Sequence, residues 1–136
     1  MKINVDMTTM CSSHSNGSLL MALTGDTAAY APVDGCWTET DPCQFETQVR
    51  NLAYGLMVRN YRSGNVIGFS GCTDDMKPFI SLACRLSHLM PAFSDEENAA
   101  AVIPAADIDY LIRIGSAWSR KYSSSVDRTI TRLMLG

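Results

Sequence analysis

The stretch DPCQFETQVRNLAYGLMVRNYRSG, residues 41–64, has the clearest pattern in this 136-residue sequence. Asp41 can cap a helix, and Pro42 suits the first helical position because no intrahelical N–H is needed there. Apolar residues then recur at steps of three and four, as on one face of a helix: Phe45, Val49, Leu52, Ala53, Leu56, Met57 and Tyr61. We therefore predict a helix over residues 42–62. It would be about 31 Å long and could cross a whole small sheet.

The residues before this helix are predicted to form short strands and turns. Residues 2–7 alternate polar with apolar side chains, and an apolar run at 19–23 follows a polar turn, so the two suggest a hairpin. A second loop is expected over residues 30–37, where a proline and an Asp-Gly pair interrupt the chain.

The residues after the helix are predicted to be mostly helical. In order, the expected elements are a buried strand at 65–69, a helix from Asp75 to Pro91, a short helix from the capping box Ser94/Glu97 to Pro104, a long helix from about 106, and a terminal helix after serines 123–125. The fold class is therefore α+β in a single domain, residues 1–136. We expect one small antiparallel sheet from the N-terminal third, joined by the later strand and packed by the long helix and a C-terminal helical cluster.

Composition and charge exclude several classes of protein. No window is apolar enough to span a membrane, and no apolar stretch follows the first lysine as in a secretory signal, so a cytoplasmic location is expected. The net charge is −3, and residues 1–47 carry six acids against one lysine. This balance disfavours nucleic acid as a partner. The five cysteines are odd in number and irregularly spaced, which favours reduced thiols.

One turn could carry a nucleophile. Gly68-Phe69-Ser70-Gly71-Cys72 lies where a strand should pass into a helix, and a helix N-terminus would lower the pKa of Cys72. Either Ser70 or Cys72 would then be the nucleophile of a small enzyme, and His88, the next histidine along the chain, its base. The alternative is a glycine turn chosen for its backbone geometry. The motif departs from a nucleophile elbow because Cys72 stands where glycine is needed.

A zinc site is a weak alternative for the two histidines. Cys11 and His14 form one short pair, and Cys84 and His88, four residues apart on a predicted helix, form another. The first spacing is not that of a zinc knuckle, and a domain of this size needs no metal to fold. We therefore expect no metal and no cofactor.

Binding of another protein is the preferred function. Trp37 and Tyr30 lie among Asp34 and Glu39 in the predicted loop, and an aromatic group in an acidic loop suits a partner surface. A tryptophan that anchors the loop to the core is an equally good interpretation. The sequence thus suggests a regulatory, accessory or inhibitor protein, of the sort that mobile genetic elements encode, which could also form a homo-oligomer.

Overall fold

The computed structural model describes residues 29–93 and 98–135, and these residues have an α+β fold. The predicted hairpin of residues 2–7 and 19–23 and the capping box at Ser94 and Glu97 lie outside these ranges. The elements in chain order are β1 (Ala29–Val33), β2 (Cys36–Thr40), α3 (Pro42–Val58), β3 (Val66–Ser70), η1 (Asp74–Met76), α4 (Lys77–Leu86), β4 (Met90–Ala92), β5 (Ala101–Pro104), η2 (Ala105–Asp107), α5 (Ile108–Ala117) and α6 (Ser119–Leu135).

Strands β1 and β2 form a hairpin where a loop was predicted. Asp34 and Gly35 link the strands, with φ angles of 53° and 83°. Two consecutive residues with positive φ make the tight turn that matches strand twist, and Asp-Gly is a preferred pair for it. The loop prediction was wrong because it took Asp34-Gly35 as a sign of an irregular loop and not of a hairpin turn.

A second, separate sheet contains three parallel strands in the order β4-β3-β5. The predicted sheet is therefore confirmed only in part. The hairpin is an antiparallel sheet in the N-terminal third, but β3 does not join it and pairs with β4 and β5 instead. Helix α4 lies between β3 and β4 in the chain, and such a crossover returns the second strand parallel to the first. Residues 101–104 form β5 and not the end of a short helix. Val102 and Ile103 are β-branched and fit a strand.

The start of helix α3 is confirmed, and its end comes earlier than predicted. The side chain of Asp41 accepts a hydrogen bond from the backbone N–H of Gln44 at 2.8 Å, and Pro42 is the first helical residue. The helix ends at Val58, because Asn60 adopts a φ of 62° that no helix continues.

Two further helix boundaries differ from the predictions. Helix α4 ends at Leu86, before His88 with its φ of 63°, so Pro91 lies in β4 and does not stop a helix. The C-terminal helices break at Trp118, whereas serines 123–125 continue within α6. The break lets α6 bury Val126 and Ile130, and this burial outweighs the weak helix propensity of serine.

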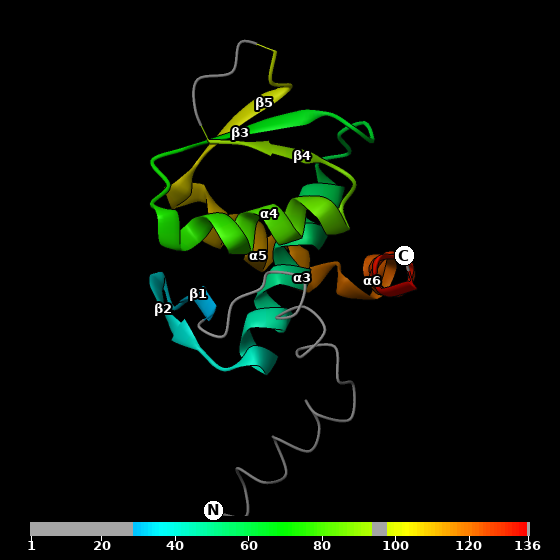
Figure 1. The fold of residues 1–136 in the computed structure, drawn as a ribbon, viewed down its shortest axis with the longest axis horizontal. Helices are drawn as coiled ribbons and strands as arrows, with labels where there is room; N and C mark the ends of the chain where they lie inside the picture. Colours follow the sequence, from blue (N-terminus) through cyan, green and yellow to red (C-terminus); the bar gives the residue numbers. More distant parts are fainter. Residues whose placement is uncertain (1–28, 94–97, 136) are drawn as a thin grey trace, which may run out of the picture.

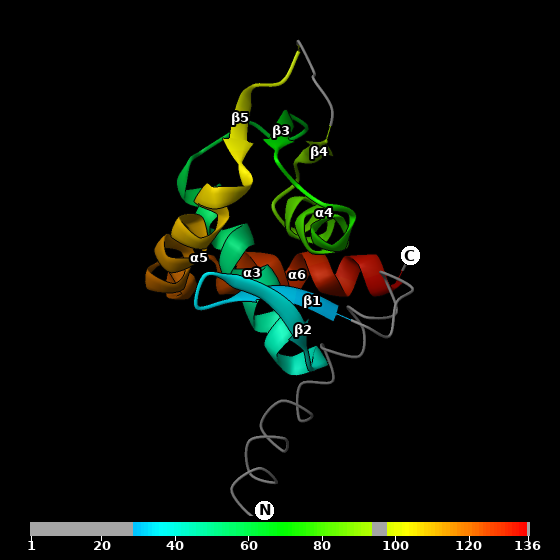
Figure 2. The same ribbon diagram turned by 90° about the vertical axis from the view of Figure 1, so that its left-hand side faces the viewer.

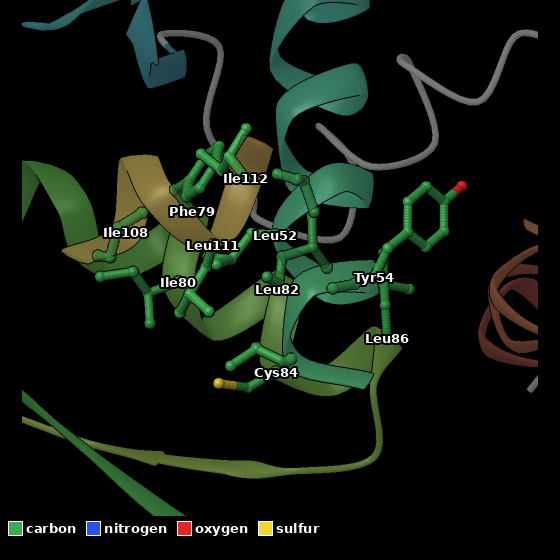
Figure 3. Packing of buried hydrophobic residues seen from close by; sticks show 14 of the residues in the cluster. Leu52, Tyr54, Phe79, Ile80, Leu82, Cys84, Leu86, Ile108, Leu111 and Ile112 are labelled. Atoms are coloured by element: carbon green, nitrogen blue, oxygen red, sulfur yellow. The ribbon is translucent and has the colours of Figure 1, made fainter. Parts of the chain in front are cut away.

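Helix α4 lies between the three-stranded sheet and the hairpin (Figures 1 and 2). Apolar side chains of α3, α4 and α5 meet in the core, where Figure 3 shows Leu52, Phe79, Ile80, Leu111 and Ile112 close together. Helices α3 and α5 pack very closely at two glycines. A Cβ atom on Gly55 would collide with the carbonyl group of Leu111, and one on Gly115 with that of Asn51.

Candidate functional site

The hairpin carries all four residues that were predicted to bind a partner. Tyr30 on β1 and Glu39 on β2 are directly opposite each other, and both are exposed. Asp34 is exposed at the turn. Paired residues of an antiparallel ladder point to the same face, so the tyrosine ring and the carboxylate of Glu39 share one surface. We call the exposed residues Tyr30, Asp34 and Glu39 the hairpin surface.

Trp37, two residues before Glu39 on β2, is on the same face of the hairpin but is not part of the exposed surface. Its side chain is half-buried, and its ring meets Phe79 of α4 edge to face at a centroid distance of 5.1 Å. Phe79 in turn contacts Phe45 of α3 with the same kind of geometry at 5.8 Å. This row of three rings joins the hairpin to the core, so the tryptophan fits the anchoring interpretation of the sequence.

The hairpin surface is acidic. Residues 29–49 contain Asp34, Glu39, Asp41 and Glu46 and no lysine or arginine. Glu46 is buried and paired with Arg50, whereas the other three are exposed. The hairpin turn also lies beside α5, because a Cβ atom on Gly35 would be 4.0 Å from the Asp109 carboxylate. Within residues 29–93 and 98–135, neither Asp34 nor Glu39 forms an ion pair, so the surface presents negative charge next to an aromatic ring.

The structure does not bring together the nucleophile and base of the alternative enzyme hypothesis. Ser70 and Cys72 precede α4, and His88 follows it. The ten residues of this helix separate the two ends by about 15 Å. The Nε2 atom of His88 instead lies 3.3 Å from the hydroxyl oxygen of Thr129 on α6.

The expected low pKa of Cys72 is also wrong. Burial raises the pKa of this thiol, and the nearby charge of Lys77 opposes the shift without overcoming it. Cys72 precedes the 3₁₀ turn η1 and not the first turn of α4, so it does not gain the full dipole of a long helix. A thiol in this state is a poor nucleophile near neutral pH.

The two residues of the weak zinc hypothesis that the structure describes, Cys84 and His88, do not form a metal site. Cys84 is buried in the core, and burial raises its pKa to about 12, while His88 is exposed. Cys11 and His14 lie outside the described residues. Within residues 29–93 and 98–135, no three His, Cys, Asp or Glu side chains are grouped to hold a metal ion.

The cysteines differ in redox state. Cys36, Cys72 and Cys84 are free thiols, whereas Cys43 is disulfide-bonded. The expectation of reduced thiols throughout is therefore wrong at Cys43. That expectation relied on the odd number and irregular spacing of the cysteines. Neither property shows which two thiols lie close together in the folded chain.

A groove between α4 and β4 was not predicted from the sequence. Its volume is about 670 Å³, and its lining residues are Asp74, Lys77, Pro78, Ser81, Leu82, Arg85, Leu89, Met90 and Pro91. Lys77, Ser81 and Arg85 follow at steps of four, which indicates one polar side of a helix. That spacing was a usable signal, but only the fold shows that β4 lies next to it.

No family model, curated protein or solved structure matches this chain. Among the described residues, no helix combines the length and apolar character needed to cross a membrane.

Proposed function

We propose that this chain is a small regulatory or inhibitory protein that binds a partner protein through the hairpin surface. The observation that supports the proposal most is the cross-strand pair of Tyr30 and Glu39, both exposed and both in a sequence segment, residues 29–49, that has no lysine or arginine. Tyrosine supplies a large contact area at protein interfaces, and unpaired carboxylates favour a basic partner. A cytosolic location and homo-oligomer formation remain predictions from the sequence.

The hairpin is suited to hold such a surface rigidly. Its tight turn sets the register of the strands, and the Trp37–Phe79 contact fixes β2 to α4. A rigid surface loses little conformational entropy when a partner binds, so more of the contact energy contributes to affinity.

The test is affinity purification of the tagged full chain from its host, with quantitative mass spectrometry and native mass analysis. A double variant, Tyr30→Ala with Glu39→Lys, should lose a partner that the unmodified chain retains. The matched control, Tyr110→Ala with Asp107→Lys, changes an exposed tyrosine and an exposed acid outside the hairpin and should keep that partner. If both double variants recover the same proteins in equal amounts, the hairpin surface is not the binding site.

A further inference from the structure

The groove between α4 and β4 is separate from the hairpin surface and has a different charge. Two of its lining residues, Lys77 and Arg85, are basic, whereas residues 29–49 contain no base at all. The two sites therefore suit different ligands. We call the groove the α4–β4 groove below.

The positive charge of the groove is arranged along one helix. Lys77 lies in the first turn of α4 and Arg85 in the last, eight residues later. At 1.5 Å per residue they are about 12 Å apart along the axis. The Arg85 side chain is exposed and forms no ion pair with any described residue. One cation is thus free for a ligand at one end of the groove.

The other cation, Lys77, has two exposed or weak contacts, of which one is with the Phe93 ring, 5.6 Å from Nζ to the ring centroid. Lys77 forms an ion pair with Asp74 at 2.9 Å, and the Asp74 side chain is 93% exposed. Such exposed pairs contribute little to stability because water screens them. A carboxylate from a ligand can replace Asp74 at small cost.

The floor between the two charges is apolar. Leu82 and Leu89 are buried there, and Met90 at the start of β4 is 57% exposed. Methionine adapts its shape to different apolar groups. A ligand that spans both charges would therefore place an apolar group in the middle.

We propose that the α4–β4 groove binds an extended acidic segment of a partner protein, with two carboxylates four residues apart and an apolar side chain midway between them. In an extended chain, residues i, i+2 and i+4 point to the same side and span about 13 Å, which matches the spacing of Lys77 and Arg85.

Side chains, and not strand pairing, supply most of this binding. Strand β4 is an edge of the three-stranded sheet and could in principle accept another strand. Its central residue is Pro91, which has no backbone N–H to donate. Recognition therefore depends on the two charges and the apolar floor.

The test uses the full chain and a display library of randomised seven-residue peptides. We expect enrichment of peptides with acids four positions apart and an apolar residue midway between them. For an enriched peptide, fluorescence anisotropy should show that Arg85→Gln weakens binding about fivefold, the upper range for loss of one exposed ion pair. Asp74→Asn should strengthen binding about threefold, because it frees Lys77 and removes a repelling charge. An increase in affinity cannot be explained by misfolding.

The matched control is Arg113→Gln, which removes an exposed arginine of α5 outside the groove and should leave the affinity unchanged. The proposal is overturned if acidic peptides are not enriched, or if Arg113→Gln and Arg85→Gln have equal effects. Self-association that Arg85→Gln abolishes, measured by sedimentation, would assign the groove to a second copy of this chain and would also overturn it. None of these variants alters the hairpin surface, so the two binding proposals can fail independently.

Discussion

Arg50 on α3 donates a hydrogen bond from Nη1 to Oδ1 of Asp127 on α6, at 2.6 Å, and so connects residues 77 positions apart in the sequence. Its Nε atom also donates to Glu46 one turn earlier, at 2.7 Å. Burial alone would lower the pKa of Arg50, but hydrogen bonds with Tyr54, Asp127 and Glu46 and the charge of Glu46 raise it. The arginine is therefore a permanent cation that ties α6 to α3.

Replacing this arginine should destabilise the fold. Arg50→Met leaves the carboxylate of Glu46, which is 8% exposed, without its cation, and we expect a loss of about 2–4 kcal/mol in the free energy of unfolding. Asp127→Asn should cost less than about 1 kcal/mol because the Asp127 side chain is 58% exposed. Urea denaturation measures both. Equal losses in the two variants would show that the bond to Asp127, and not the burial of Glu46, dominates.

The close contact of α3 and α5 predicts that Gly115→Ala is destabilising. The added Cβ atom would meet the backbone carbonyl of Asn51, which has no freedom to move aside, so we expect a loss of about 2 kcal/mol or more. Helix propensity alone predicts the opposite, a gain of about 1 kcal/mol. Ser116→Ala, at the next and exposed position, is the control and should change stability by less than about 0.5 kcal/mol. Thermal and urea unfolding distinguish the two directions.

The buried thiol of Cys84 should make stability depend on alkaline pH. Its pKa is about 12 in the fold against an ordinary value of 9.0. Above pH 9 the unfolded chain loses this proton while the folded chain keeps it, so stability falls as pH rises from about 9 to 12, by up to about 1.4 kcal/mol per pH unit. Cys84→Ala should have a shallower decline in this range than the unmodified chain.

Cys36→Ala is the control, because it removes an exposed thiol and leaves Cys84 in place. Alkylation under native conditions gives an independent measurement. The thiol of Cys36 should react faster than that of Cys84, which is inaccessible as well as protonated. If the free energy of unfolding declined equally with pH for the unmodified chain and for Cys84→Ala, Cys84 would not be the source of the pH dependence.

Trp37 should contribute more to the stability of the fold than Tyr30, which we expect to contribute mainly to binding. Trp37→Ala removes the edge-to-face contact with Phe79 and part of the core, so we expect a loss of about 2 kcal/mol in the free energy of unfolding. Tyr30→Ala should cost less than about 1 kcal/mol, because Tyr30 is 37% exposed. Urea unfolding checks both values. If Tyr30→Ala proved the more costly, the ring would be part of the core and not a free binding surface.

Local patterns in the sequence were enough to predict the start and the buried face of α3. The Asp41 cap, the proline after it and the three-and-four spacing of apolar residues all act within a few turns of one helix. The same reasoning predicted β3 within one residue of its observed bounds, and the α+β class. It also placed Tyr30, Asp34 and Glu39 in one acidic segment. These predictions succeeded because each depends on residues that are near one another in the chain.

Only the tertiary structure decided which strands pair, where Trp37 packs and what lies beside α4. Parallel pairing of β3 with β4 and β5 joins residues more than twenty positions apart, and no local pattern specifies such a partner. The same holds for the groove, which needs β4 next to the row of Lys77 and Arg85, and for Cys72 and His88, which α4 holds apart. Helix caps and faces are local properties of the chain, whereas strand pairing, burial and grooves depend on contacts that form only when distant segments pack together.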